Sequence, residues 1–329
     1  MRLSIWWIPL FVGLVACHRG NRTGPIRLGF FPNFTQGQAL VGNAEGTFHQ
    51  ALQGRPLEMK QFMAGPSAME ALLGGSLDLC YVGSGPAITA FSRAPGMLHI
   101  IAGAASGGAV FVVRGIRNAR ELIGKRVASP QMGNSQDVAL RFWLKGQGLP
   151  FSETAGRRDA VTVTPLSNAD IFGLFKRGDL GGAWVPEPWG ARLRHDAGGR
   201  IFLDERTLWP DGKFPTTVLV VSHDALIHRR EDIKAILRAH LALTARAQQQ
   251  PEPFAKALNE AYGTLTSHPL GETVLKDALS RIEFTSELLP TQLQLAADHS
   301  RALGFIPSSD INGLVDDSLL REVQEPAGR

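Results

Sequence analysis

The sequence predicts a two-lobed α/β protein in which each lobe is a mainly parallel sheet flanked by helices. Short apolar runs with glycine-rich exits alternate with helical stretches, a pattern typical of βαβ units covered on both faces. The chain has 329 residues, whereas a single hydrophobic core usually stops growing near about 250–300 residues. The segments 75–82 and 178–185 also align without a gap, which indicates two lobes of similar construction.

The composition excludes several classes of protein. With 44% hydrophobic and 19% charged residues, the chain is neither a disordered tail nor a coiled coil or fibrous repeat. Its 34 Lys+Arg and 30 Asp+Glu give a net charge of +4 that is spread thinly, with no block of five or six like charges. A phosphate backbone needs a basic stripe, so we do not expect nucleic acid as a partner.

The N-terminus is typical of an export signal. Met1-Arg2 precedes the apolar run Leu3–Ala16, which is shorter than the roughly 20 residues of a membrane span and fits the core of a signal peptide. Small residues then lead into Cys17, and this segment resembles the lipobox of bacterial lipoproteins. The alternative is a plain signal peptide followed by an incidental cysteine. We expect removal of the signal peptide at 1–16 and acylation of Cys17, for example with palmitate, on a tether formed by residues 17–24. The body would then lie outside the cytoplasm, in the periplasm or its equivalent, anchored to a membrane.

The first lobe is expected over residues 25–110 and 215–329. Its first part and the start of the next lobe should contain strands at 26–31, 57–62, 77–82, 98–104 and 110–113. The helices expected between them are 36–52, 68–73 and 87–92. After a strand at 218–222 the chain shows helical periodicity with no further strand, so this tail should pack back on the first lobe. The helices expected in the tail are 232–250, 253–262, 271–280 and 291–303.

The second lobe is expected over residues 111–214. The strands predicted there are 126–129, 161–165 and 182–185. The helices predicted there are 135–147 and 168–177. The chain would cross between the lobes at 106–108 and again at 213–217. Two crossings form a hinge, and hinge closure around a ligand is a common switching mode.

Known catalytic motifs are missing from the sequence. Around Ser84, the glycines of a nucleophile elbow would have to stand at positions 82 and 86, which are Val and Pro. The chain also lacks a dinucleotide fingerprint, a P-loop and paired metal-ligating histidines, and His195 and His223 are better explained by solvated or capping roles. We therefore predict no enzyme activity, no cofactor and no metal.

Three strand exits rich in Gly, Ser and Asn each open a helix, at 65–67, 83–85 and 133–135. In open α/β sheets, ligands bind outside the carboxyl ends of the strands, where helix N-termini offer free N–H groups to an anion. Capping explains any one exit alone. Three exits around one cleft indicate a binding site.

A further exit, Trp184-Val185-Pro186-Glu187-Pro188-Trp189, holds a carboxylate and two indoles in a loop stiffened by proline. Indoles supply an apolar wall with one N–H donor each. We expect this loop to form one wall of the cleft, although Trp189 fits a place in the core equally well.

Together these segments resemble the lipid-anchored or periplasmic solute-binding proteins of ABC importers, in the branch of aliphatic sulfonate, taurine and nitrate binders. The segments that carry the resemblance are 30–33, 38–42, 64–68, 75–78, 133–140 and 182–189, and the likeness extends over about residues 25–310. It implies the type II periplasmic-binding-protein fold and a monomer that delivers a small ligand to a permease driven by a cytoplasmic ATPase.

The resemblance also implies the ligand contacts. In the first lobe they are Asn33, Phe34, Gln38, Gly65, Pro66, Ser84 and Gly85. In the second lobe they are Asn134, Ser135, Trp184, Glu187 and Trp189. Hydroxyls, amides and backbone N–H groups can hold a sulfonate without an arginine, whereas an ionised Glu187 facing the cleft would repel an anion and favour a zwitterion.

The expected function is therefore capture of a small organosulfur anion or zwitterion, an aliphatic sulfonate or a taurine-like molecule. Three alternatives stay open. The solute could instead be nitrate or a pyrimidine-type compound. The chain could be a biosynthetic enzyme on the same fold, although it lacks the Cys- and His-rich segments of such proteins. It could also be a sensory or structural lipoprotein that binds a partner.

Overall fold

The structure is a computed structural model that describes residues 24–325. The predicted signal peptide and Cys17 lie outside the described residues, so the expected cleavage and acylation remain predictions. Within residues 24–325, no helix is both long and apolar enough to cross a membrane.

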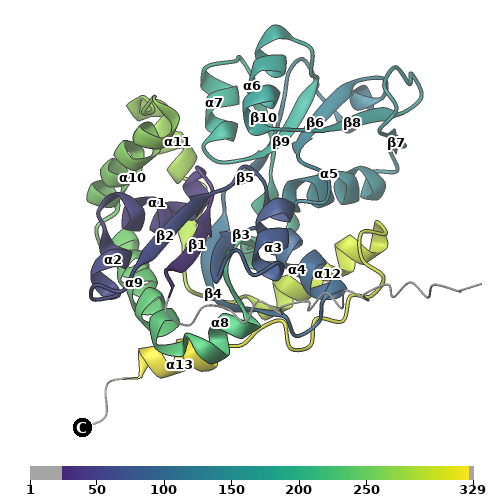
Figure 1. Cartoon of the computed structure of the whole chain (residues 1–329). Coiled ribbons are helices and arrows are strands. Elements are labelled where there is room, and N and C mark those ends of the chain that lie inside the picture. Colours follow the sequence, from purple (N-terminus) through teal and green to yellow (C-terminus); the bar gives the residue numbers. More distant parts are fainter. Residues whose placement is uncertain (1–23, 326–329) are drawn as a thin grey trace, which may run out of the picture.

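The chain forms two six-stranded sheets, each covered by helices (Figure 1). The first has the order β12-β4-β11-β3-β1-β2 and the second the order β10-β5-β9-β6-β8-β7. We call the parts built on them lobe 1 and lobe 2. The strands of lobe 1 are β1 (Ile26–Phe30), β2 (Leu57–Gln61), β3 (Leu79–Val82), β4 (Leu98–Gly107), β11 (Pro215–Ser222) and β12 (Ile282–Phe284). Those of lobe 2 are β5 (Ala109–Val113), β6 (Arg126–Pro130), β7 (Phe151–Ser152), β8 (Val161–Leu166), β9 (Gly182–Pro186) and β10 (Arg200–Asp204). The predicted two-lobed α/β class is confirmed.

Both sheets are mixed: the expected mainly parallel pairing holds in lobe 2, whereas antiparallel pairs are the majority in lobe 1. In lobe 1, β1 is parallel to β2 and β3, but β11 is antiparallel to β3 and β4. In lobe 2, β6 is parallel to β8 and β9, but β5 is antiparallel to β9 and β10. The antiparallel pairs follow from the path of the chain. The strand β5 enters lobe 2 and β11 re-enters lobe 1, so both strands run away from the cleft. The strands paired with them run towards it.

We propose that the chain passes between the lobes at Gly107–Gly108, where β4 ends and β5 begins, and at Lys213–Phe214, before β11. Gly107 and Gly108 both have φ of 76°, a conformation that side chains with a Cβ rarely adopt. A Cβ on Gly107 would also collide with the backbone oxygen of Arg281. This first crossing therefore depends on glycine.

Helices cover both faces of each sheet. In lobe 2 they are α5 (Ser135–Gly146), α6 (Asn168–Arg177) and α7 (Trp189–His195), with 3₁₀ turns η2 (Ala119–Leu122), η3 (Glu205–Leu208) and η4 (Pro210–Gly212). In the first part of lobe 1 they are η1 (Phe34–Gln36), α1 (Gly37–Ala44), α2 (Thr47–Ala51), α3 (Gly65–Leu73) and α4 (Ser84–Arg93). The helix predicted over 36–52 is therefore divided, because Gly46 adopts a left-handed φ of 71° between α1 and α2.

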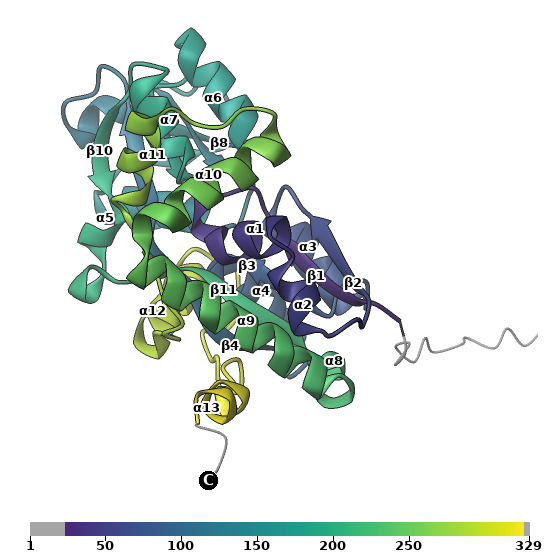
Figure 2. The ribbon, with the colours of Figure 1, turned by 90° about the vertical axis from the view of Figure 1, so that its left-hand side faces the viewer.

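The tail packs on helices of lobe 1, and it contains a strand that the sequence analysis missed. Its helices are α8 (His223–His228), α9 (Arg230–Gln249), α10 (Pro251–Thr266), α11 (Glu272–Leu279), α12 (Pro290–Ala302) and α13 (Ser318–Gln324). The helix α9 packs along α1 and α2, and α10 packs along α1 (Figure 2). The missed strand, β12, pairs with the end of β4 and places Ile282 opposite Gly107. It therefore brings the neighbouring Arg281 to the first crossing.

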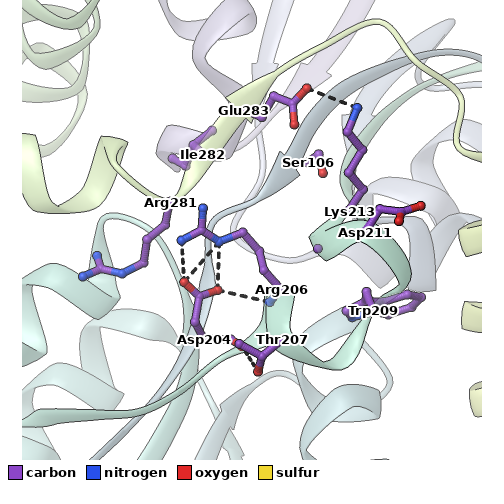
Figure 3. Close-up of a pocket in the computed structure, with 11 residues that line it drawn as sticks. Ser106, Asp204, Arg206, Thr207, Trp209, Asp211, Lys213, Arg281, Ile282 and Glu283 are labelled. Carbon is purple, nitrogen blue, oxygen red and sulfur yellow. Dashed lines mark hydrogen bonds and ion pairs between the residues drawn. The ribbon is translucent and has the colours of Figure 1, made fainter.

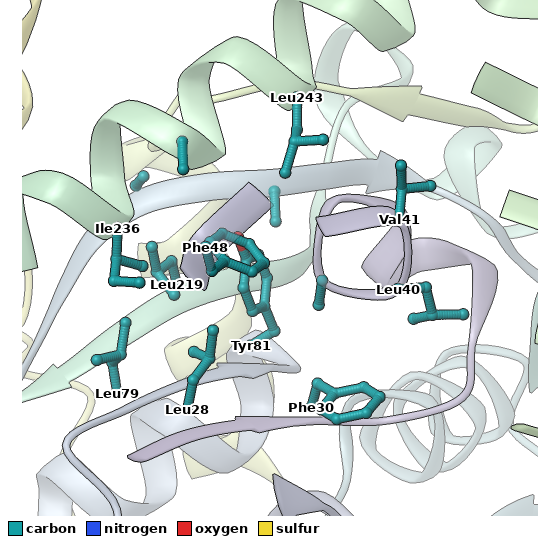
Figure 4. Close-up of a cluster of buried hydrophobic side chains, with 14 of the residues drawn as sticks. Leu28, Phe30, Leu40, Val41, Phe48, Leu79, Tyr81, Leu219, Ile236 and Leu243 are labelled. Atoms are coloured by element: carbon teal, nitrogen blue, oxygen red, sulfur yellow. The ribbon is translucent and has the colours of Figure 1, made fainter. Parts of the chain in front are cut away.

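The largest core lies between the lobe 1 sheet and the helices α1, α2 and α9. Leu28, Phe30, Phe48 and Tyr81 are among its buried side chains, and Ile236 reaches them from α9 (Figure 4). Each large buried side chain contributes about 1.5–3 kcal/mol of apolar burial. This core holds the carboxyl ends of β1 and β3 fixed at the edge of the sheet that faces lobe 2.

Candidate functional site

A small cavity of about 60 Å³ lies between the lobes, at the carboxyl ends of the parallel strands. The residues that line it from lobe 1 and the second crossing are Phe31, Asn33, Thr35, Gln36, Met63, Ala64, Gly65, Gly83, Pro86, Thr216 and Thr217. Those from lobe 2 are Pro130, Asn134, Ser135, Gln136, Asn168 and Pro186. This is the place where open α/β sheets bind ligands, and the volume suits a solute of few atoms.

Four helices begin at this cavity. Gly65 and Asn168, the first residues of α3 and α6, line it, and so do Gly83 and Asn134, the N-cap residues of α4 and α5. The first-turn N–H groups of a helix have no acceptor within the helix, and the helix dipole places partial positive charge there. Among the described residues, the cavity lining contains no Asp, Glu, Lys, Arg or His. The cavity therefore offers neutral donors and a positive potential, which suits a small anion.

The lobes touch each other beside the cavity. The N–H of Gly85, in α4 of lobe 1, donates to Oγ of Ser135, in α5 of lobe 2, at 3.0 Å. A Cβ on Gly85 would lie 3.1 Å from the backbone nitrogen of Ser135, and a Cβ on Gly83 would lie 2.8 Å from Ser135 Oγ. Such close approach requires glycine on the lobe 1 side, and it shows that the lobes are closed at this point.

Four of the predicted contact residues line this cavity: Asn33, Gly65, Asn134 and Ser135. Ser84 and Gly85 lie next to it and face Ser135 in a smaller cavity of about 20 Å³. Pro66 lines a separate apolar cavity beside α3 and α4. The structure therefore brings six of the predicted residues to the polar cavity or directly beside it, and Pro66 to a neighbouring one.

Phe34 and Gln38 point into the core of lobe 1, which corrects their assignment to the ligand. Phe34 is fully buried and meets Tyr262 edge-on, with ring centroids 5.2 Å apart. Gln38 is also fully buried, and its Nε2 donates to the oxygen of Ala104 at 2.7 Å. Gln36 lies in the cavity lining instead, because the 3₁₀ turn η1 shifts the residues that face the cavity.

The two indoles are not part of the cavity wall either. Trp184 is fully buried in lobe 2, stacks on Phe111 with centroids 5.5 Å apart, and donates from Nε1 to Glu205 at 2.7 Å. Trp189 packs against Phe172 and lies under the guanidinium of Arg192. Both residues stabilise lobe 2.

Glu187 is also turned away from the cavity. Its side chain is fully buried, Oε1 pairs with Arg281 Nη1 at 2.9 Å, and Oε2 accepts the N–H of Ala191 at 2.9 Å. Burial raises the pKa of Glu187 to about 7, although Arg281 acts to lower it. The carboxylate joins the lobes at the first crossing, so the argument that it repels an anion does not apply.

The comparisons with known proteins agree with this geometry. Residues 20–260 match the sequence model of the NMT1-like family, which is more than half of the chain. The chain belongs to the NMT1-like family. It is 28% identical to the taurine-binding periplasmic protein of Escherichia coli over 61% of this chain, and the match spans only 60% of that relative.

Solved structures confirm the periplasmic-binding-protein fold of this NMT1-like chain. The periplasmic aliphatic sulphonate-binding protein of Escherichia coli superposes with a TM-score of 0.70 at 21% identity, covering 89% of this chain and 92% of that one. The periplasmic nitrate-binding protein of Synechocystis superposes with a TM-score of 0.74 at 15% identity, covering 92% and 88%.

Asn168 is the most informative cavity residue that the sequence analysis missed. Its Oδ1 is buried and has no hydrogen-bond partner within the described part of the chain. A buried amide oxygen without a partner is costly, and the amide group can present either its oxygen or its nitrogen to a ligand. Asn168 follows β8 and opens α6, which is the same signal that identified Asn134 after β6. Thr35, Gln36, Thr216 and Thr217 were also missed, since the first two lie in the 3₁₀ turn η1 and the last two at the start of β11.

A larger cavity of about 600 Å³ lies beside the crossings, between η3, η4 and β12. Its cations are already paired: Arg206 with Asp204, and Lys213 with Glu283 (Figure 3). The third, Arg281, pairs with Glu187 and Asp277. The cations of this cavity are therefore neutralised by the protein's own carboxylates.

Glu205 is a second buried carboxyl group near the lobe boundary. It accepts Nε1–H of Trp184 at 2.7 Å and of Trp209 at 3.4 Å. Burial raises its pKa to about 7, although the two indoles act to lower it. At neutral pH this group is therefore partly protonated in the folded protein.

Glu205→Gln is expected to stabilise the protein at high pH relative to the wild type. An unfolded Glu ionises near pH 4.3, whereas folded Glu205 ionises near pH 7, so the stability contributed by its neutral form is present below pH 4.3 and is lost as the pH rises to 7. The loss is about 4 kcal/mol at most. Melting temperatures measured from pH 4 to 8 should diverge in favour of the variant as the pH rises. The exposed Glu252→Gln is the control, and a constant difference between Glu205→Gln and wild type would contradict the prediction.

Proposed function

We propose that this NMT1-like protein is the extracytoplasmic, lipid-anchored solute-binding component of an ABC importer. It captures a small sulfonate between its lobes and delivers it to a permease. The observation that carries the proposal is the uncharged cavity between the lobes, at which four helix N-termini meet. A sulfonate has three acceptor oxygens and one delocalised charge, so several neutral donors can hold it at once.

The relatives support the same class of function. The matched relative is named for taurine binding, and the superposed structures are named for aliphatic sulphonate and nitrate binding. Nitrate is a second candidate, because it is also a small monoanion with three oxygens and the cavity measures only about 60 Å³. Taurine is less well matched, since its ammonium group needs an acidic partner and Glu187 is bound to Arg281.

Titration calorimetry on residues 18–329 tests this proposal. Methanesulfonate, taurine and nitrate would be titrated separately, and each ligand would be checked by NMR after incubation. We expect saturable binding of methanesulfonate with one site per chain and no chemical change. Absence of heat with all three ligands, or conversion of any of them, would overturn the proposed function.

Ser135→Ala is expected to weaken methanesulfonate binding. The hydroxyl lies in the cavity and also accepts the hydrogen bond that joins the lobes. Loss of a hydrogen bond costs about 0.5–1.5 kcal/mol between neutral groups and about 1.5–3 kcal/mol with a charged partner. Calorimetry should therefore give a lower affinity for Ser135→Ala, while the exposed Thr264→Ala on α10 should bind like the wild type. Equal affinity of Ser135→Ala and wild type would remove Ser135 from the site.

A further inference from the structure

The charges of the protein are divided unevenly between the lobes. Lobe 2, over residues 109–214, contains 16 Lys+Arg and 11 Asp+Glu. Lobe 1, over residues 24–108 and 215–325, contains 14 Lys+Arg and 19 Asp+Glu. The two lobes therefore carry net charges of opposite sign, and the basic lobe is expected to attract a partner with negative charge.

The cations of lobe 2 gather at the end that is farthest from the polar cavity between the lobes. Lobe 2 forms one end of the molecule (Figure 1). Its strands β6, β8 and β9 run towards the cavity, whereas β5 runs away from it. The residues before the first three strands and after β5 therefore share the far end of the sheet. We call this end the basic pole. It consists of segments 114–126, 157–159 and 176–179 and of Arg200, with ten Lys or Arg and three Asp or Glu.

Backbone hydrogen bonds hold these segments side by side. The N–H of Arg114 donates to the oxygen of Gly181 at 3.0 Å, and the N–H of Gly181 donates to the oxygen of Arg126 at 2.8 Å. The N–H of Gly124 donates to the oxygen of Ala160 at 3.0 Å, which joins the turn before β6 to the segment before β8. Charges that are thinly spread along the sequence are therefore collected on one surface by the fold.

Several cations of the basic pole are free to meet a partner. Four of them are exposed and have no carboxylate partner within residues 24–325, namely Arg117, Arg120, Lys125 and Arg158. The three acidic residues of the pole are engaged elsewhere, since two pair with neighbouring arginines and one accepts a backbone N–H and an asparagine amide. The pole therefore presents a positive surface that the protein itself does not neutralise.

An exposed apolar side chain lies within the basic pole. Ile123 is 38% exposed and stands in the turn before β6, between Arg120 and Lys125 in the sequence. Apolar groups flanked by cations are typical of surfaces that bind at the boundary between lipid headgroups and acyl chains. A soluble polyanion would offer such a side chain no apolar contact, so Ile123 favours a membrane over other negatively charged partners.

We infer that the basic pole binds the surface of a membrane that contains anionic phospholipids. Headgroup phosphates accept hydrogen bonds from arginine, and each Lys or Arg near such a surface raises partitioning about fivefold, which corresponds to about 1 kcal/mol. The inference goes beyond the proposed function and does not depend on it. A basic surface is a common second membrane signal beside an acyl chain. The described chain begins in lobe 1, so the pole adds a contact at the other end of the body and leaves the polar cavity uncovered.

Vesicle sedimentation tests the inference on residues 18–329, a form that lacks the cysteine expected to be acylated. The vesicles would consist of phosphatidylcholine alone or with about one-third phosphatidylglycerol, in about 0.1 M salt. We expect binding to the anionic vesicles, loss of this binding at about 1 M salt, and no binding to phosphatidylcholine alone. Free glycerol phosphate should not compete, because a single phosphate engages only a small part of the pole.

Charge variants test whether the basic pole is the surface that binds. A fourfold variant removes its unpaired cations and should lower partitioning about 100-fold or more; it combines Arg117→Gln, Arg120→Gln, Lys125→Gln and Arg158→Gln. A matched control removes four exposed cations from helices of lobe 1 and should bind nearly like the wild type. It combines Arg238→Gln, Lys256→Gln, Lys276→Gln and Arg301→Gln. Circular dichroism would verify that both variants are folded.

Ile123→Ser tests the choice of a membrane as the partner. It keeps every charge of the pole and should lower partitioning severalfold, because less apolar surface enters the headgroup region. The inference is overturned if the anionic vesicles do not bind the protein, or if the fourfold pole variant binds as tightly as its control. Equal binding of Ile123→Ser and wild type would point to a soluble polyanion or an acidic protein and would also overturn it. The assay contains no solute, so its failure would leave the proposed function intact.

Discussion

Gly85→Val is expected to weaken solute binding by about 10-fold to 100-fold without unfolding either lobe. Even a single added Cβ would lie 3.1 Å from the backbone nitrogen of Ser135, and the larger valine would hold the lobes apart. Overpacking a tight contact costs about 1–3 kcal/mol, and opening the lobes relieves this strain. The cost therefore falls on the closed, ligand-bound form, so affinity should drop while the melting temperature of the free protein changes little.

The matched control is Gly146→Val at the end of α5, where a Cβ meets no atom within 4 Å. This variant should bind methanesulfonate like the wild type, because valine is a better helix former than the glycine that it replaces and meets no neighbouring atom. Gly85→Ala should give an intermediate affinity. If Gly85→Val bound methanesulfonate with wild-type affinity, closure at the Gly85–Ser135 contact would not be required for binding.

Arg281→Met is expected to lower the free energy of unfolding by about 3–5 kcal/mol, because it leaves the buried carboxylate of Glu187 without its partner. Arg281 also pairs with Asp277 at 2.6 Å, and Asp277 accepts hydrogen bonds from Arg194 and His195 of α7. The substitution therefore removes the centre of an ionic cluster that joins lobe 1 to lobe 2. Urea unfolding at pH 8 would measure the loss.

The pH dependence and a double variant distinguish a lost ion pair from a general packing defect. Burial already raises the pKa of Glu187 to about 7, and removal of Arg281 takes away an influence that lowers it. Glu187 would then be protonated at pH 5, so the loss should be smaller at pH 5 than at pH 8. Adding Glu187→Gln should restore much of the stability lost at pH 8. A loss that is the same at both pH values and in the double variant would contradict this explanation.

The parts of the fold and the site that depend on neighbouring residues could be predicted from the sequence. The strand exits at Gly65, Gly83 and Asn134 are encoded by apolar runs that end in residues suited to helix starts. Their convergence follows from the rule that parallel strands present their carboxyl ends at one edge. Asn168 carries the same local signal and could have been included on the same grounds.

The parts that depend on distant residues could not be predicted. Glu187 pairs with Arg281, which lies 94 positions away on a turn before the short strand β12. Trp184 is enclosed by Phe111 and Trp143, and a tryptophan in a strand buried on both faces has no pattern that separates core from cleft. Gln36 lines the cavity in place of the predicted Gln38 because η1, a single 3₁₀ turn, changes which side chains face the cavity.

Small-angle X-ray scattering with and without bound methanesulfonate tests the central claim, which is that two hinged lobes close over the solute. The sample would be residues 18–329, with binding verified by calorimetry in the same buffer. The account predicts that the radius of gyration falls when the ligand saturates the protein and that Gly85→Val keeps the larger value. An identical radius of gyration for the free and the saturated wild type would contradict it.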